Sequence, residues 1–179
     1  MRFTTFFLLL LICALTVGDV AHAAQTAPDV NGAEARDFTR FSAVLPAGWD
    51  GEERTGFHSG KDEECMLILG VKDEAGENYR GLVSIFVLPN DRQTTSENLA
   101  RELTRFQVDA TEPAQEGHFW SFTGEPRSQA FKAPALTKVH ATADMVLIAI
   151  IQDPEGLGGQ AAFESLRGLT PQTRQLLGR

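Results

Sequence analysis

The chain has 179 residues, with 16 Lys and Arg against 24 Asp and Glu, and a formal net charge of −8. Hydrophobic residues make up 42% and charged residues 22% of the sequence, which is typical of a globular protein and not of a disordered or fibrous one. The length predicts one domain with a substantial core. The excess of acids argues against nucleic acid as a partner, because binding to a phosphate backbone requires clustered Lys and Arg.

The first residues have the pattern of a secretory signal peptide. Arg2 gives a positive start, an apolar run follows from Phe6 to Val17, and Ala21 and Ala23 supply the small residues of a signal-peptidase site. The apolar run is shorter than the ~20 residues that a membrane-spanning helix needs. We therefore expect a signal peptide over 1–23, cleavage after Ala23, no stable membrane anchor, and a periplasmic or secreted protein.

A lipid anchor is an alternative, because the residues from Leu10 to Cys13 loosely resemble a lipobox. The residue before the lipobox Cys should be small, whereas Ile12 is large, and the apolar run continues past Cys13. We therefore expect no lipid anchor. Cleavage would then leave Cys65 as the single cysteine, without an internal disulfide. The apolar stretch Cys65–Val71 favours a buried, unreactive thiol over one that forms an intermolecular disulfide.

Strands dominate the first part of the predicted domain. Residues 24–37 are rich in Ala, Asn, Gly and Pro and are expected to form a flexible leader, so that the single globular domain spans 38–179. Phe38–Leu45 alternates between apolar and polar residues, which is typical of a strand with one solvated face. A turn at Pro46–Trp49 and a polar strand at Asp50–Phe57 follow.

Three later segments are apolar on both of their alternating faces: Cys65–Val71, Leu82–Leu88 and Met145–Ile151. Strands of this kind lie in the centre of a sheet that is covered on both sides. More exposed strands are expected at His118–Thr123 and around Ala130–Ala141.

Helices are expected to cover this sheet. The pattern from Thr94 to Glu97 predicts a capping box with Thr94 as N-cap, and Leu99, Leu103 and Phe106 follow on one helical face. Further helices are expected at Gly159–Arg167 and from Thr170–Pro171 to Leu177. The order of these elements predicts an α+β fold, a largely antiparallel sheet covered by helices on both faces.

The segment Phe41–Trp49 (FSAVLPAGW) resembles the opening strand and turn of the Mog1/PsbP-like superfamily. Trp120 and Phe122 in a later strand, and Phe163–Leu169 near the last helices, are also similar to that family. The resemblance, which includes the small exported DcrB-like bacterial members, implies an α/β/α sandwich. It also implies a binding or assembly protein, and no partner-site residue is carried over from it.

The residues with reactive side chains lack the spacing of known catalytic or metal motifs. His58 and the run Asp62–Cys65 include metal-ligand types, but no two of them have the spacing that places donors on one metal. Ser84 lies in a predicted strand without the Gly-x-Ser-x-Gly turn. Gly156–Gly159 lacks the residues of a phosphate-binding loop. We therefore expect no catalytic residue, metal site or cofactor.

These observations favour an exported, non-enzymatic binding or assembly module of the cell envelope, with a protein partner. The alternative is a carrier of a small molecule or lipid with a pocket between sheet and helix. Trp49, Trp120 and Phe122 would line that pocket, because large aromatic residues dominate ligand sites, although the two tryptophans also fit core or hairpin packing. A hydrolase is the third alternative.

Overall fold

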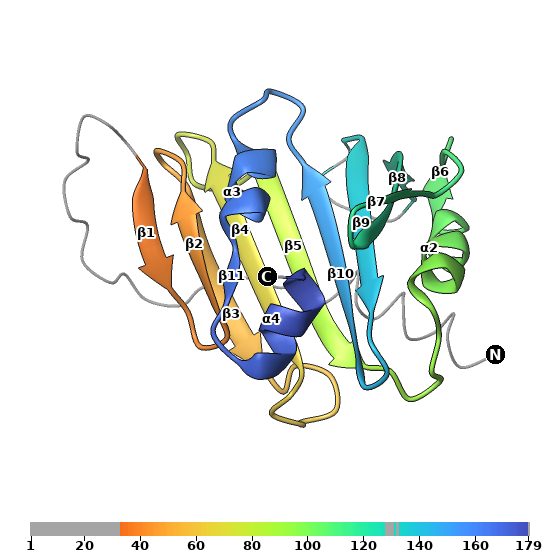
Figure 1. The fold of residues 1–179 in the computed structure, drawn as a ribbon. Coiled ribbons are helices and arrows are strands. Elements are labelled where there is room, and N and C mark those ends of the chain that lie inside the picture. The colour runs from red at the N-terminus through yellow and green to blue at the C-terminus, as the bar shows by residue number, and fades with distance from the viewer. Residues whose placement is uncertain (1–32, 128–130, 132, 179) are drawn as a thin grey trace.

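The computed structural model describes residues 33–127, 131 and 133–178. An eight-stranded sheet extends through the molecule in the order β3-β4-β5-β10-β9-β8-β6, with β7 paired to β8 (Figure 1). Every strand pair in the described residues is antiparallel. The strands are β3 (Asp50–Thr55), β4 (Cys65–Lys72), β5 (Tyr79–Pro89), β6 (Gln107–Val108), β7 (Ala114–Glu116), β8 (Phe119–Pro126), β9 (Ala135–Ala141) and β10 (Met145–Gln152).

Both faces of this sheet are covered. A three-stranded sheet of β1 (Glu34–Asp37), β2 (Phe41–Leu45) and β11 (Arg167–Gly168) packs on one face. Helices α3 (Gly159–Ser165) and α4 (Pro171–Leu177) lie on the same face, as Figure 1 shows. The remaining described helix, α2 (Ser96–Thr104), packs on the other face. The expected α+β class, with a largely antiparallel sheet covered on both faces, is confirmed.

The alternation of side chains along the central strands creates two separate cores. Leu147, Ala149 and Ile151 of β10 enter the first core, which the sheet forms with β2, α3 and α4. Val146, Ile148 and Ile150 enter the second core, which contains Leu99, Ala100 and Leu103 of α2. Strands β4, β5 and β10 are neighbours in the sheet. The prediction that the apolar strands form its centre is therefore correct.

The folded domain begins earlier than expected. Residues 34–37, which we expected in the flexible leader, form β1 and pair with β2 in the register Glu34↔Leu45 to Asp37↔Ser42. All four residues of β1 are exposed, so the strand carries no alternation of apolar and polar residues. Backbone hydrogen bonding to β2 forms it. The expected signal peptide over 1–23 lies outside the described residues.

The start of α2 differs from the expectation by one residue. The N-cap is Thr95, whose side chain accepts a hydrogen bond from the backbone of Asn98, and not Thr94. Thr94 is unavailable as a cap because its backbone N–H and C=O are both bonded to the side chain of Asn90. The expected helix through Arg167 also ends early, at Ser165, because the chain then pairs with β2 as β11.

Candidate functional site

The loop between β5 and α2 is organised by Asn90. The side-chain amide of this residue donates to the carbonyl oxygens of Thr94, at 3.0 Å, and Thr142, at 2.7 Å. Its side-chain oxygen accepts from the backbone N–H of Thr94 at 2.9 Å. Its own backbone N–H donates to the backbone carbonyl oxygen of Asp144 at 2.7 Å. Asn90 is 5% exposed and therefore fixes the start of α2 against the turn between β9 and β10.

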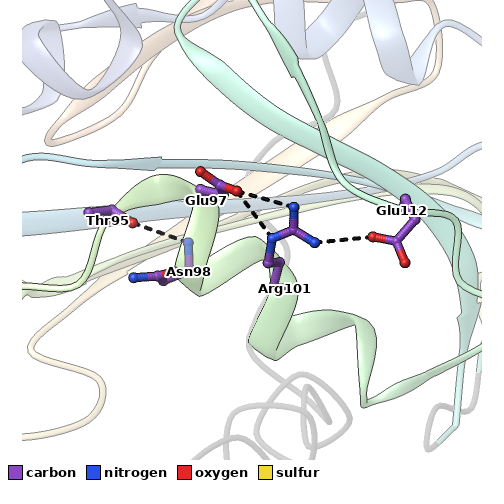
Figure 2. A network of polar contacts seen from close by, with 5 residues as sticks. All are labelled: Thr95, Glu97, Asn98, Arg101 and Glu112. Carbon is purple, nitrogen blue, oxygen red and sulfur yellow. Dashed lines mark hydrogen bonds and ion pairs between the residues drawn. The ribbon is translucent and has the colours of Figure 1, made fainter.

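A network of ion pairs holds the exposed side of α2 (Figure 2). The guanidinium of Arg101 donates to the carboxylate of Glu97 at 3.1 and 3.2 Å, and to that of Glu112 at 3.1 Å. The Glu112 pair links α2 to the segment that precedes β7. Exposed pairs of this kind add little to stability. Their effect is to fix the position of the Arg101 guanidinium and satisfy its charge.

A cavity of about 670 Å³ lies between α2 and the sheet. Five aliphatic side chains, each less than a tenth exposed, form its floor: Leu88 of β5, Val146 and Ile148 of β10, and Leu99 and Leu103 of α2. The rim consists of Pro89, Asn90, Asp91, Arg92, Gln93, Thr94, Asn98, Arg101, Glu102 and Arg105. An apolar floor with a few polar groups around it is typical of sites for small ligands, whose volumes are roughly 300–1,000 Å³. We call this the α2 cavity.

A second cavity, of about 640 Å³, opens at the start of α2. It shares Asn90, Gln93 and Thr94 with the α2 cavity, so the β5–α2 loop separates the two. Trp120 lines it from β8. Gln93, in the shared loop, has a φ of 51°, a left-handed conformation that is uncommon for residues other than glycine. Such strained positions are found more often at functional sites than elsewhere.

The rim of the α2 cavity carries charged side chains of both signs. Arg92, Arg101 and Arg105 line it together with Asp91 and Glu102. Arg101 is paired as described above. The side chain of Arg105 is exposed and makes no hydrogen bond or ion pair with any described residue. Its position at the C-terminal end of α2 favours a cation, because the helix dipole is negative there.

The structure does not bring the three aromatic candidates of the sequence together. Trp49 belongs to the first core, is 7% exposed, and donates its indole N–H to the carbonyl of Leu157 at 2.9 Å. Phe122 is 2% exposed in the second core, on the opposite face of the sheet. Trp120 packs against that second core and is only half-buried. Of the three, Trp120 lines one of the two cavities, and Trp49 and Phe122 serve as packing residues.

The thiol of Cys65 is inert in its surroundings. It is fully buried and donates to Oε1 of Glu53 at 2.9 Å, while the same carboxylate accepts from the backbone N–H of Arg40. Burial, and then the hydrogen bond to Glu53, raise the pKa of the Cys65 thiol far above its usual range. The thiol therefore remains protonated, and a protonated thiol is a poor nucleophile and metal ligand.

The acidic run before β4 has a structural role. The carboxylate of Glu64 is buried and accepts hydrogen bonds from the backbone N–H groups of His58 and Ser59 and from the hydroxyl of Ser59. It thus closes the β3–β4 hairpin. Within the described residues, no group of three His, Cys, Asp or Glu side chains is placed to hold a metal ion.

The glycine-rich segment before α3 already has an anion bound to its backbone. The carboxylate of Asp153 accepts hydrogen bonds from the N–H groups of Leu157, Gly158 and Gly159 at 2.7 to 3.0 Å. These are the groups that a phosphate would use. The segment is therefore an internally closed turn.

One pair of side chains outside the sequence candidates resembles a nucleophile and a base. The ammonium of Lys138 lies 3.5 Å from the hydroxyl of Ser121, and both residues are less than a tenth exposed. The same ammonium donates to Glu116 at 3.0 Å, and this contact lowers the pKa of the Glu116 carboxyl. These two contacts of Lys138 connect β9 to β7 and β8.

The residues of the α2 cavity were assigned other roles by the sequence. The sequence predicted that Val146 and Ile148 are core residues of a strand. It predicted that Arg105 lies on the outer face of a helix. The sequence offers one signal for the cavity rim, which is a polar face on α2. Asn98, Glu102 and Arg105 recur at i, i+4 and i+7 and therefore share this face. The structure places this face beside an aliphatic sheet surface.

No protein-family model and no curated protein matches the chain. The solution structure of cyanobacterial PsbP (CyanoP) from Synechocystis sp. PCC 6803 matches with 11% identity over 82% of this chain and 98% of that one, at a TM-score of 0.40. A crystal structure from Bacteroides thetaiotaomicron matches with 10% identity over 74% of this chain, at a TM-score of 0.40. This chain spans only 46% of that protein.

A largely antiparallel sheet covered on both faces is the architecture that the Mog1/PsbP-like resemblance implies. Among the described helices, none has both the length and the apolar character needed to cross a bilayer.

Proposed function

We propose that the chain is an exported, non-enzymatic binding module of the cell envelope that holds its ligand in the α2 cavity. The observation that carries this proposal is the cavity itself, with its aliphatic floor and its polar, charged rim. A ligand with both apolar and polar parts would bury its apolar part on the floor and keep its polar part at the rim. Burial of apolar surface contributes about 25 cal/mol per Å² to binding.

The rigidity of the rim supports a binding role. Asn90 fixes the β5–α2 loop through four hydrogen bonds, and Glu97 and Glu112 fix Arg101. A site that is ordered before the ligand arrives avoids part of the entropic cost of association.

A small ligand fits the cavity better than a protein surface does. The floor residues Leu88, Val146 and Ile148 are 3%, 6% and 4% exposed. Side chains this deeply placed are out of reach of a flat protein partner, whereas a slender ligand enters between α2 and the sheet. The envelope protein partner that the sequence favours would then bind the ligand-loaded module.

Native mass spectrometry of the freshly purified protein tests the proposal. Val146→Phe fills the α2 cavity at a cost of about 1–3 kcal/mol in stability, as is usual for an overpacked core. Val44→Phe adds the same volume at an exposed position of β2, 45% exposed, and serves as the matched control. We expect the wild type and Val44→Phe to carry a co-purifying small molecule and Val146→Phe to be bare.

Two outcomes would contradict the proposal. A ligand that Val146→Phe retains as fully as the wild type does would place the site elsewhere. A wild type that is bare when it is purified from envelope fractions would remove the small-ligand function altogether.

A further inference from the structure

We propose that the ligand of the α2 cavity is a long-chain fatty acid, with its hydrocarbon chain on the aliphatic floor and its carboxylate on Arg105. This inference rests on the proposed function and specifies its ligand class. It draws on three independent properties of the cavity: the chemistry of the floor, the unpaired guanidinium at one end, and the balance of charge around the rim.

The floor suits a hydrocarbon chain. Its five residues are all Leu, Ile or Val, so the floor contains no aromatic ring and no polar side chain. A sugar or a nucleotide lying on this surface would bury hydroxyl or amide groups without partners, at a cost of roughly 1–3 kcal/mol each. An alkyl chain has no such groups and gains from burial along its whole length.

The guanidinium of Arg105 indicates that the head group of the ligand is a carboxylate. This residue lies on the cavity-lining face of α2, one turn beyond Arg101, at the end of the helix. Arg101 is already satisfied by Glu97 and Glu112 (Figure 2). Arg105 has no carboxylate partner among the described residues. A guanidinium can donate two parallel hydrogen bonds to one carboxylate, which is the geometry that a fatty-acid head presents.

The rim favours a head with a single negative charge. Asp91 and Glu102 line the rim together with Arg92 and Arg105, and Arg101 is already neutralised by Glu97 and Glu112. A head with one negative charge pairs with Arg105 and adds the least further negative charge to this rim. A phosphate monoester, with nearly two negative charges, would be repelled by Asp91 and Glu102, and a neutral head would leave the Arg105 guanidinium without a partner.

Titration of the delipidated full chain with palmitate, below its critical micelle concentration, tests the assignment. The alcohol of the same chain length is the neutral comparison ligand. Arg105→Gln removes the guanidinium at an exposed position and should not disturb folding. Arg36→Gln, on exposed strand β1, removes a positive charge that pairs with Asp50 and does not line the cavity, and it is the control for the loss of charge alone.

We expect one palmitate per chain. Arg105→Gln should weaken palmitate binding about two- to fivefold, since an ion pair at an exposed position contributes up to about 1 kcal/mol and each 1.4 kcal/mol is a factor of ten. Binding of the alcohol should be weaker than that of palmitate and unchanged by Arg105→Gln. Arg36→Gln should bind palmitate as the wild type does.

Equal binding of palmitate and the alcohol, or unchanged palmitate binding in Arg105→Gln, would overturn the head-group assignment. Val146→Phe separates this failure from that of the proposed function. If it abolishes binding of both ligands, the α2 cavity is still the site and only the fatty-acid assignment is wrong. If it leaves both unaffected, the cavity is not the site and both proposals fail.

Discussion

The reactivity of Cys65 is set by its neighbours. The residue packs in the first core, and its thiol donates a hydrogen bond to the carboxylate of Glu53. Burial and this contact both stabilise the neutral thiol over the thiolate. A cysteine that activates as a nucleophile needs the opposite surroundings, with a nearby positive charge or a helix N-terminus.

We therefore predict that thiol reagents do not label Cys65 in the folded protein and label it completely after denaturation. Lys61→Cys provides an exposed thiol in the same hairpin and should be labelled at once under native conditions. Peptide mass spectrometry after maleimide treatment measures both. Rapid labelling of native Cys65, or a disulfide-linked dimer on a non-reducing gel, would show that this site is accessible.

The stability of the β3–β4 hairpin depends on pH through the carboxyl group of Glu64. Burial alone would raise the pKa of this carboxyl, but the hydrogen bonds from Ser59 and His58 outweigh burial, and the pKa in the folded protein lies below its usual value. A carboxyl with a lowered pKa stabilises the folded state above its unfolded pKa. This contribution is lost as the pH falls through the folded pKa.

Ser59→Ala should reduce the free energy of unfolding by about 1–2 kcal/mol at neutral pH, because it removes one hydrogen bond to the charged Glu64. The difference from the wild type should shrink below about pH 4 and vanish once Glu64 is protonated in both proteins. Thermal unfolding across this pH range measures it. Glu63→Gln, at an exposed neighbouring position, should show no such pH-dependent loss. A difference for Ser59→Ala that stays constant down to low pH would mean that the bond does not depend on the charge of Glu64.

Among the elements, β10 contributes most to the connection between the two cores. All eight of its residues are buried, and it pairs with β5 on one side and β9 on the other. Fully burying a Leu or Ile side chain contributes roughly 1.5–3 kcal/mol. The whole domain is expected to be stable by only about 5–15 kcal/mol.

Leu147→Asp should therefore prevent folding. Leu147 is fully buried in the first core, where a carboxylate would find no partner and no water. Glu155→Ala removes an exposed ion pair with Arg80 and should change stability by less than about 1 kcal/mol. Circular dichroism and thermal unfolding distinguish the two. If Leu147→Asp melted like the wild type, β10 would be peripheral and the arrangement of two cores around it would be incorrect.

Elements with a hydrophobic pattern or a cap could be predicted from the sequence. The apolar strands β4, β5 and β10 and the short helix α4, with its Thr170 cap and Pro171, lie where the pattern indicated. Strands of two to four residues could not be predicted, because they are too short to show an alternation of apolar and polar residues: β1, β6, β7 and β11. The N-cap of α2 depends on a contact of Thr94 with Asn90, which propensity does not reveal.

The candidate site was less predictable than the fold, because it depends on which face of the sheet each residue and each helix occupies. Trp49 and Phe122 are both aromatic residues in strand-rich segments, yet they belong to opposite faces. Their faces follow from the path of the chain and not from local spacing. The α2 cavity requires α2 to leave part of an aliphatic sheet surface uncovered at its side, which no residue pattern records.

The C-terminal helix α4 connects the two ends of the described chain. The hydroxyl of Thr173 donates to the carbonyl of Arg40 at 3.0 Å, across 133 residues of sequence, and the N–H of Leu169 donates to the same carbonyl at 2.9 Å. Leu176 is fully buried in the first core with Phe41 of β2. Because α4, β2 and the sheet bury one another, we expect them to unfold together.

Leu176→Ala should lower the free energy of unfolding by about 2–5 kcal/mol, the usual cost of a cavity left by a buried Leu. The loss should appear as one cooperative transition at a lower temperature, because α4 packs in the same core as β2 and the central strands of the sheet. Gln175→Ala, at an exposed position of the same helix, should change stability by less than about 0.5 kcal/mol. Differential scanning calorimetry measures both. Because α4 lies on the face of the sheet opposite the α2 cavity, Leu176→Ala should bind palmitate with unchanged affinity below its melting temperature. Two separate transitions would show instead that α4 and β2 form a unit that melts independently of the sheet.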